Sequence, residues 1–351
     1  MRICICATQV PFHTGGAEIH VEGLRRELEA RGFDVSVVTL PFDHSTRLEI
    51  IKSSLAWRLV NLQAGGATGG PDLVIATRFP SYAVKHPNKV VWLIHQYRQV
   101  YDLLGTPYSD FKDDPQDRQV VEMVRSIDRR ALGEARALFT NSRNTADRLK
   151  RFNDLVARPL YPPPGLDGAY RCDKYGDFLF SVGRLDTLKR FDLLIRALQH
   201  TSAEVRCLIA GECPERRKLP ALFEVLGLAE RVQLLGRISD EELLVRYAEA
   251  FAVFYAPYDE DYGYVTIEAF RSRKAVITAR DSGGVLEFVR DGINGYVCSS
   301  ADPRQFARPI EQLHADRELA KRLGERGAEA VSEIAWDHVI SSLTGRLTAR
   351  G

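Results

Sequence analysis

The sequence contains no long hydrophobic run and no excess of charge of either sign. Because a membrane-spanning helix needs roughly 20 consecutive apolar residues, we expect no transmembrane segment. The 48 Lys and Arg residues nearly balance the 47 Asp and Glu residues, which leaves a formal net charge of +1. A balanced charge argues against a general nucleic-acid-binding protein, so no nucleic-acid partner is predicted.

Cysteine pairs with the spacing of a metal site are also lacking. The cysteines are scattered along the chain, and several fall in segments that we predict to be buried strands. We therefore expect reduced thiols in the core of a cytoplasmic protein. The first predicted strand begins directly after Met1, so no signal peptide is recognised. The six cysteines are Cys4, Cys6, Cys172, Cys207, Cys213 and Cys298.

The glycine pattern of a nicotinamide-binding fold is missing as well. No G-x-G-x-x-G follows the first predicted strand, and this absence disfavours a Rossmann oxidoreductase. The glycine-rich run at residues 65–70 (GGATGG) has the wrong spacing and follows no strand. We expect this run to be a flexible surface loop.

Apolar strands alternate with helix-period segments along the 351 residues, of which 45% are apolar. This length suits two domains, and the alternation is typical of parallel α/β sheets. The turn at residues 161–165 (YPPPG) fits neither a helix nor a central strand, so we place the boundary there, between residues 1–163 and 164–330. The predicted strands lie near residues 2–8, 34–40, 73–77, 89–95, 136–140, 156–161, 178–183, 205–210, 231–235, 251–256, 275–279 and 295–298.

The predicted architecture is a pair of Rossmann-like domains whose parallel sheets face a central cleft. Ligands of such sheets bind outside the carboxyl ends of the strands. The residues that follow each strand are therefore the first candidates for a functional site.

The most informative segment is residues 251–297, in which Glu260 and Glu268 stand eight positions apart. An apolar strand leads into a polar loop that holds Glu260, and Gly263 then opens a helix that carries Glu268 on its second turn. The N–H groups at a helix N-terminus attract phosphate, and flanking carboxylates can accept hydrogen bonds from paired hydroxyls. The pattern indicates a nucleotide-sugar cradle. The alternative is an ordinary strand-loop-helix unit with solvated acidic residues.

The residues that follow favour the cradle. A second glycine turn, residues 281–284 (DSGG), comes after the strand at 275–279, and Glu287 lies just beyond it. The whole segment resembles the donor-site signature of retaining family 4 glycosyltransferases of the GT-B fold. The resemblance implies a sugar-diphosphonucleoside donor whose ribose hydroxyls contact Glu268 and whose sugar hydroxyls contact Glu260.

Further donor contacts are expected at the start of the same helix. Backbone N–H groups of Gly263, Tyr264 and Val265 should bind the diphosphate. Two positions depart from the commoner family pattern, because Asp261 replaces a glycine before the aromatic Tyr262, and Tyr264 replaces a small apolar residue. The extra carboxylate of Asp261 could bind another sugar hydroxyl.

Two cations follow the first strand of the second half. Arg184 and Lys189 come after Gly183, at the carboxyl end of the strand, where fixed positive charge would stabilise a departing diphosphate. They resemble the arginine-lysine diphosphate clamp of the family; the alternative is a charged loop in solvent. By the same resemblance the base should lie near Gly236 and Arg237.

The first half has a glycine turn of its own. Gly15 and Gly16 follow the first predicted strand and open a helix, so a ligand could approach the backbone closely there. The resemblance places this loop against the donor phosphates and the acceptor. His95 resembles the histidine that family members hold near the anomeric centre, although it could also be a core histidine. The residues expected to line the acceptor pocket are His13, His95, Arg98 and Tyr101.

Residues 259–261 spell D-x-D, the metal motif of the other large transferase fold. In that fold the motif lies in a single nucleotide-binding domain, whereas here it directly precedes a helix N-terminus that already offers positive charge. We therefore expect no obligatory metal and no cofactor.

The segment 46–62 mixes basic and apolar residues in an amphipathic pattern. Such a helix either lies on a membrane surface or packs on its own sheet. A peripheral membrane contact, and with it a lipid-linked or polysaccharide acceptor, is allowed by the sequence.

The predicted function is that of a retaining hexosyltransferase, which moves a sugar from a UDP- or GDP-linked donor to an acceptor hydroxyl of a glycan, polysaccharide or glycolipid. The alternatives are a GT-B-like sugar-nucleotide epimerase or hydrolase, and a non-catalytic nucleotide-sugar binding protein. In the family a final helix, here within residues 331–351, packs back on the N-terminal domain. The candidate catalytic residues are His95, Arg184, Lys189 and Glu260.

Overall fold

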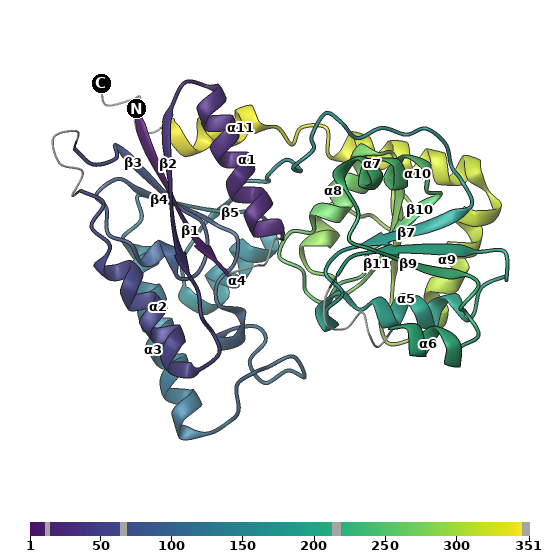
Figure 1. The fold of residues 1–351 in the computed structure, drawn as a ribbon, viewed down its shortest axis with the longest axis horizontal. Coiled ribbons are helices and arrows are strands. Elements are labelled where there is room, and N and C mark those ends of the chain that lie inside the picture. Colours follow the sequence, from purple (N-terminus) through teal and green to yellow (C-terminus); the bar gives the residue numbers. More distant parts are fainter. Residues whose placement is uncertain (11–14, 64–68, 213–218, 346–351) are drawn as a thin grey trace. The chain divides into compact units, whose positions relative to one another are not determined.

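The computed structural model describes residues 1–10, 15–63, 69–212 and 219–345, and its ribbon is drawn in Figure 1. The chain divides into two compact units. The first unit comprises Met1–Gly165 together with the C-terminal segment from Ile334, and the second comprises Leu166–Glu333. His13, Cys213 and most of the glycine-rich run at 65–70 lie outside the described residues.

The first unit is built on a six-stranded parallel sheet in the order β2-β1-β3-β4-β5-β6. All six strands predicted for this half are confirmed, with ends that differ by a few residues. They are β1 (Arg2–Gln9), β2 (Asp34–Pro41), β3 (Leu73–Ala76), β4 (Lys89–Leu93), β5 (Ala137–Thr140) and β6 (Arg158–Pro159).

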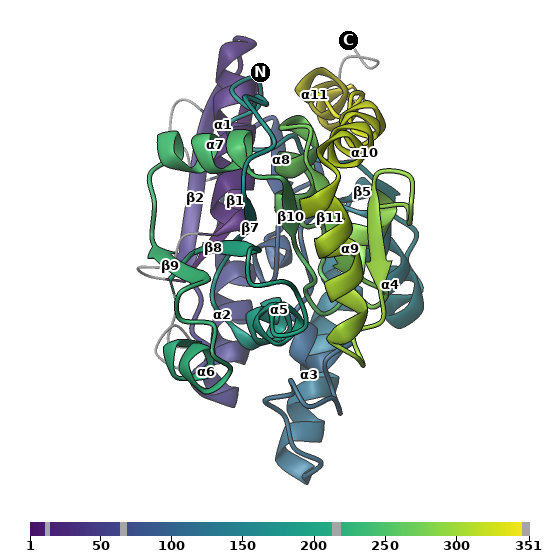
Figure 2. The same ribbon diagram turned by 90° about the vertical axis from the view of Figure 1, so that its right-hand side faces the viewer.

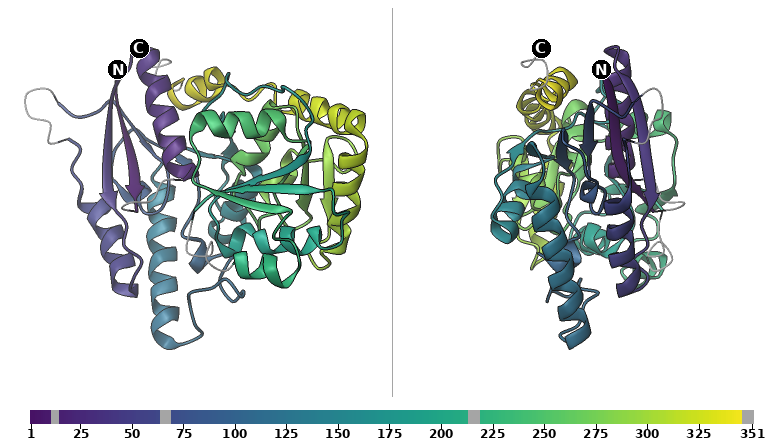
Figure 3. Two further views of the ribbon diagram at one scale, coloured as in Figure 1. Left: turned by 45° about the vertical axis from the view of Figure 1, so that its right-hand side comes forward. Right: turned by 90° about the vertical axis from the view of Figure 1, so that its left-hand side faces the viewer.

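Side chains of β1 alternate between the two faces of this sheet, as the period of a strand requires. Cys4 and Cys6 join the core on the side of α2 to α4, whereas Ile3 and Ile5 join the core on the side of α1 and α11 (Figures 1 and 3). The helices are α1 (Gly16–Ala30), α2 (Arg47–Leu59), α3 (Pro115–Gly133), α4 (Arg143–Asn153) and α11 (Trp336–Thr344), with short 3-10 turns η2 (Ser81–Ala83) and η3 (Arg98–Val100).

The C-terminal helix α11 packs beside α1 on this first unit (Figure 1). The Trp336 ring is 6.2 Å from the ring of Trp92 in an edge-on arrangement. Gly23 lets the ring approach, because a Cβ at position 23 would stand 2.7 Å from the Trp336 indole. The last helix therefore completes the core of the first unit.

Helix α2 covers the segment in which the sequence allowed a membrane-surface helix. It packs on its own sheet, with Ile50, Ile51 and Trp57 buried. Each basic side chain of the helix is paired with a carboxylate, which reduces its attraction to an anionic surface. The pairs are Arg47 with Asp117, Lys52 with Glu49 and Arg58 with Glu134. None of the described helices is long and apolar enough to cross a bilayer.

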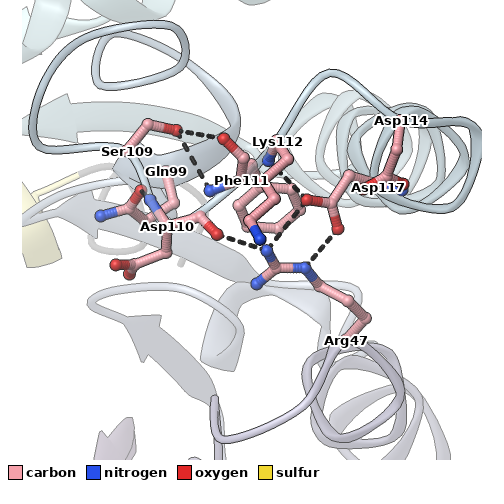
Figure 4. A network of polar contacts seen from close by, with 8 residues as sticks. All are labelled: Arg47, Gln99, Ser109, Asp110, Phe111, Lys112, Asp114 and Asp117. Atoms are coloured by element: carbon pink, nitrogen blue, oxygen red, sulfur yellow. Dashed lines mark hydrogen bonds and ion pairs between the residues drawn. The ribbon is translucent and has the colours of Figure 1, made fainter.

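The Arg47 pair belongs to a wider network that joins two helices (Figure 4). Its guanidinium binds both carboxylate oxygens of Asp117 and the backbone carbonyl of Asp110. It also lies over the ring of Phe111, 3.7 Å from the centroid. Asp117 accepts the backbone N–H of Lys112 at 2.6 Å. The start of α2, the loop before α3 and the first turn of α3 are thus tied together.

The second unit repeats the arrangement with a six-stranded parallel sheet in the order β12-β11-β10-β7-β8-β9 (Figure 2). The six predicted strands are again confirmed. They are β7 (Phe178–Val182), β8 (Arg206–Ala210), β9 (Val232–Gly236), β10 (Ala252–Phe254), β11 (Ala275–Ala279) and β12 (Gly295–Cys298).

Helices cover both faces of this second sheet, with α5 and α6 on one face and α7 and α8 on the other (Figure 1). The six helices of the second unit that the structure describes are α5 (Phe191–Leu198), α6 (Leu219–Val225), α7 (Asp240–Glu249), α8 (Tyr264–Arg271), α9 (Arg304–Ala315) and α10 (Arg317–Ala330). The 3-10 turns η4 (Thr187–Lys189) and η6 (Gly284–Glu287) lie in loops that follow strands.

Two glycines of α10 let α8 pack closely against it. A Cβ at position 327 would stand 2.2 Å from the ring of Phe270, and a Cβ at position 324 would stand 1.9 Å from the carbonyl oxygen of Arg273. The close packing matters for the site because α8 carries Glu268.

We expect Gly327→Ala to lower the free energy of unfolding by about 2 kcal/mol, since the added methyl must displace the buried Phe270 ring. Urea unfolding followed by circular dichroism measures the change. Gly133→Ala is the matched control, because a Cβ at that helical position meets no atom within 4 Å. Equal stability of the two variants would contradict the proposed packing constraint.

Candidate active site

The loops after β7, β10 and β11 meet at one edge of the second sheet, because these three strands are neighbours and parallel. The carboxyl ends of such strands are the usual place for ligands. The loop after β7 contains Arg184 and Lys189, the loop after β10 contains Glu260, and the loop after β11 is the DSGG turn.

Lys189 contacts Glu260 directly. Its ammonium group donates a hydrogen bond to Oε2 of Glu260 and lies 3.2 Å from the hydroxyl of Tyr255. The Lys189 side chain is 15% exposed and that of Glu260 is 20% exposed, so solvent still reaches the pair. Burial and the Glu260 carboxylate raise the pKa of Tyr255, and Glu268 adds to the rise. Tyr255, absent from our sequence-based candidates, therefore lies within the field of both glutamates.

Arg190 fixes the three loops to one another, a role that we did not predict from the sequence. Its guanidinium binds both carboxylate oxygens of Asp281, at 2.8 and 2.7 Å. It also donates to the backbone carbonyls of Ala256 and Pro257. One side chain from the loop after β7 thus holds the loops after β10 and β11. This role depends on contacts between residues far apart in the chain.

The DSGG turn supports the backbone of Glu260. The N–H of Gly284 donates to the carbonyl of Glu260 at 2.7 Å, and the N–H of Glu260 donates to the carbonyl of Ser282 at 3.3 Å. Position 284 must be glycine, because a Cβ there would stand 2.3 Å from the carbonyl oxygen of Asp261. The DSGG turn therefore supports the loop that carries Glu260.

Gly263 begins α8 in the left-handed region, with φ of 84°. A Cβ at this position would also meet Val285 at 2.9 Å, so both conformation and space require glycine. The amides of Tyr264 and Val265 follow in the first turn of the helix. Beside them Tyr262 is buried and packs edge-on against Tyr264 at 5.1 Å. These residues present a helix N-terminus next to Glu260, as the sequence predicted.

Glu268 lies on the second turn of α8 and is only 8% exposed. Its Oε2 accepts a hydrogen bond of 2.7 Å from the hydroxyl of Tyr247 on α7. Burial raises the pKa of this carboxyl, whereas the hydroxyls of Tyr247 and Tyr170 lower it. The two glutamates therefore differ in surroundings, since Glu260 pairs with a cation and Glu268 with phenols.

Arg184 is not part of the contact between Lys189 and Glu260. Its side chain is 59% exposed, and its guanidinium lies 3.3 Å from the carboxylate of Asp186.

The residues predicted to lie near the base are found on the far side of β7. The backbone N–H of Arg237, the residue after Gly236, is 3.3 Å from a carboxylate oxygen of Glu212. Gly236 and Arg237 do stand at the carboxyl end of β9, where the sequence placed them.

In the first unit, His95 lies two residues past the end of β4. Its Nδ1 is 2.8 Å from the backbone carbonyl of Gln96. Since a carbonyl only accepts, Nδ1 carries the proton in this bond and Nε2 is the acceptor nitrogen of the neutral ring. The position at the carboxyl end of a strand agrees with the predicted one.

Gly15, at the start of α1 in the first unit, is bonded by a side chain of the same helix. The N–H of Gly15 donates to the carboxylate of Glu18 at 2.8 Å, and Arg78 holds the other oxygen of Glu18 at 2.8 Å. The N-terminus of α1, which Gly16 begins, is therefore occupied by a carboxylate of its own helix. The donor contacts predicted for Gly15 and Gly16 stay a prediction.

Two predicted acceptor residues are held inside the first unit. Tyr101 is 3% exposed, and its hydroxyl donates to Asp128 at 2.8 Å. We therefore correct the expectation that Tyr101 lines a pocket, because both its ring and its hydroxyl are used by the core. Arg98 is paired with Asp102 at 2.6 Å and is largely buried. His13 lies outside the described residues, so its predicted role stays a prediction.

No group of three or more His, Cys, Asp or Glu side chains within the described ranges is arranged to hold a metal ion. Within the D-x-D triplet, Asp259 has φ of 40°, and its N–H donates to the carbonyl of Asp281 at 2.7 Å. Glu260, the middle residue of the triplet, forms an ion pair with Lys189. Metal independence stays a prediction that solution experiments must test.

Both halves of the chain match known families. Residues 170–330 match the family described as glycosyl transferases group 1, and residues 14–161 match glycosyltransferase family 4. A D-inositol 3-phosphate glycosyltransferase of Corynebacterium kroppenstedtii is 25% identical over 374 residues, 92% of this chain and 82% of that protein. Its counterpart in Geodermatophilus obscurus is 29% identical over 258 residues, 63% of this chain but 55% of that protein.

Solved structures share the fold over the full chain. Sucrose-phosphate synthase from Thermosynechococcus elongatus superimposes with a TM-score of 0.79 at 21% identity, covering 100% of both chains. Anabaena HepE, solved in complex with UDP and glucose, gives a TM-score of 0.71 at 18% identity, covering 99% of this chain and 100% of that one. With both units matched by family and fold, the chain belongs to glycosyltransferase family 4 and has the GT-B fold.

Proposed function

We propose that this glycosyltransferase is a retaining hexosyltransferase that uses a UDP- or GDP-linked sugar and an acceptor hydroxyl of a glycan, polysaccharide or glycolipid. The meeting of Lys189, Glu260 and Tyr255 at the N-terminus of α8 carries the proposal. A cation, a carboxylate and helix amides in one place suit a ligand that is both phosphorylated and hydroxylated. HepE with bound UDP makes UDP the first nucleotide to test.

In this proposal the second unit binds the donor. Lys189 and Arg184 would neutralise the diphosphate, together with the amides of the first turn of α8. Glu260 would accept hydrogen bonds from the transferred sugar, and Glu268 from the ribose. Arg184 is exposed and able to reorient, so its contribution would begin when the diphosphate binds.

The first unit would supply the acceptor side, with Nε2 of His95 accepting a hydrogen bond from a sugar hydroxyl. The sequence of this half offers no obvious carboxylate nucleophile, which favours attack of the acceptor on the face that the diphosphate leaves. The leaving phosphate would then take the acceptor proton. NMR of the product should show the anomeric configuration of the donor, and a trapped glycosyl-enzyme adduct would refute front-face attack.

Thermal unfolding with UDP, GDP, ADP and NADH tests donor binding. At about 100 times its Kd, one nucleoside diphosphate should add about 2.7 kcal/mol of stability to the wild type, and Glu268→Ala should lose most of that gain. Glu224→Ala, at an exposed glutamate of α6, is the control and should keep the gain. Stabilisation by NADH alone would contradict a nucleotide-sugar site.

Product analysis separates the alternatives. Release of nucleoside diphosphate and a glycosylated acceptor supports transfer, whereas conversion of the donor without acceptor would indicate an epimerase or hydrolase. Binding without turnover would indicate a binding protein. Activity that persists in chelator is expected, and strict dependence on added manganese would refute metal independence.

A further inference from the structure

We propose that Tyr247 is a positioning residue for donor recognition: its hydroxyl fixes the carboxylate of Glu268 so that one carboxylate oxygen faces the ribose hydroxyls. The inference rests on the proposed nucleotide-sugar function. It adds a residue of α7 to a site otherwise built from strand-end loops and α8.

The Tyr247 ring is held firmly by its neighbours. It is fully buried and packs edge-on against Phe180 of β7 at 5.1 Å and against Tyr170 at 6.1 Å. Because packing fixes both side-chain torsions, the hydroxyl has a defined position. That position is 2.7 Å from Oε2 of Glu268. The phenol therefore restrains Oε2 of the carboxylate. Oε1 is then the oxygen that would face the ribose hydroxyls.

Hydroxyls, not cations, stabilise the charge of Glu268. Its contacts in the described part of the chain include no ion pair, although Arg271 stands one turn later on the same helix. Arg271 pairs with Asp167 at 3.1 Å. Burial and the charge of Asp240 on α7 raise the pKa of Glu268, and the hydroxyls of Tyr247 and Tyr170 oppose this rise.

Tyr247 thus has two effects on one carboxylate. It keeps Glu268 aimed, and it favours the ionised form that accepts hydrogen bonds from sugar hydroxyls. A hydrogen bond to an ionised group is stronger than one between neutral groups, so its loss should be measurable in ligand affinity.

The test measures Kd by calorimetry for UDP and GDP and for the matching 2′,3′-dideoxynucleoside diphosphate. Tyr247→Phe keeps the ring and should weaken the natural nucleotide about tenfold. Its effect on the dideoxynucleotide should be small, because that ligand lacks the hydroxyls that Glu268 would bind. Tyr175→Phe is the matched control: it removes a phenol that donates to the carbonyl of Arg273 at 2.8 Å, and should bind like the wild type.

A double-mutant cycle asks whether Tyr247 acts through Glu268. The variant with both Tyr247→Phe and Glu268→Gln should bind no more weakly than Glu268→Gln alone. Additive losses would mean that Tyr247 acts on the ligand by another route and would overturn the inference.

The pH profile gives a second readout that a purely structural role would not move. Donor binding should weaken as pH falls through the pKa of Glu268. Removing the Tyr247 hydroxyl raises that pKa further, so the acid limb of affinity should move to higher pH in Tyr247→Phe. Titration of the diphosphate itself is common to all variants and cancels in the comparison.

The outcomes separate the two proposals. If the wild type binds neither UDP nor GDP, the proposed function fails. If the wild type binds one of them, the positioning role fails in either of two cases. In the first, Tyr247→Phe binds that nucleotide as tightly as the wild type does. In the second, Tyr247→Phe binds the natural and the dideoxy nucleotide more weakly by the same factor, and the acid limb of affinity does not move. If Tyr247→Phe does not fold, Tyr170→Phe decides, because it removes the second hydroxyl and should move affinity and acid limb in the same directions.

Discussion

Replacing Lys189 with alanine should lower kcat about 10²–10³-fold, the size of effect seen when one preorganised donor to a developing negative charge is removed. The ammonium group of Lys189 lies between Glu260 and Tyr255 at the carboxyl ends of the strands. Its position would be set before the donor binds, so the enzyme need not reorganise as the diphosphate leaves. The rate of nucleoside diphosphate release from the donor that the wild type consumes measures the loss.

Lys174→Ala is the matched control for this result. Lys174 belongs to the same unit, is well exposed and pairs with Glu249 at 3.0 Å, but it stands away from the strand ends. Its removal should leave kcat close to that of the wild type. A folded Lys189→Ala variant that keeps wild-type kcat would refute the proposal that Lys189 stabilises the leaving group.

Replacing Arg190 with lysine should lower the free energy of unfolding by about 3 kcal/mol. Lysine keeps the charge but cannot form the two-pronged contact with Asp281 while also reaching the carbonyls of Ala256 and Pro257. The Arg190 side chain is 11% exposed, and Ala256 and Pro257 are buried, so their carbonyls would lose a donor where water reaches poorly, whereas the Asp281 side chain is 37% exposed. Loosening of the loop that holds Glu260 should also reduce activity.

Urea unfolding measures the stability change, and Arg206→Lys is its control. Arg206 forms a well-exposed pair with Asp177 at 3.5 Å, and such surface pairs contribute about 0–1 kcal/mol. Equal stability of the Arg190 and Arg206 variants would show that the loops after β7, β10 and β11 are held by other contacts.

The sequence alone predicted the twelve strands, because runs of apolar residues that alternate with helix-period segments are local features of the chain. It also placed Arg184, Lys189, Glu260 and Glu268 after or near strand ends, where parallel sheets bind ligands. Gly263 could also be recognised from the sequence, because it directly precedes the adjoining helix, where it adopts a left-handed conformation.

The fate of individual side chains was harder to predict. Tyr101 lies between β4 and α3, as His95 does, yet it turns into the core and donates to Asp128. Gly15 precedes a helix as expected, but Glu18 of that helix takes its N–H. Direction and partner depend on the packing of surrounding elements, which a spacing in the sequence does not contain.

Tertiary structure decided which distant residues meet. Arg190 and Asp281 are 91 positions apart, and Tyr247 and Glu268 are 21 positions apart on different helices. They come together because the sheet runs in the order β11-β10-β7, which places loops distant in the chain at one edge, and because α7 and α8 cover the same face. Local patterns determine the elements of this glycosyltransferase, whereas strand order and helix packing, set by burial of the whole core, determine how its candidate site is assembled.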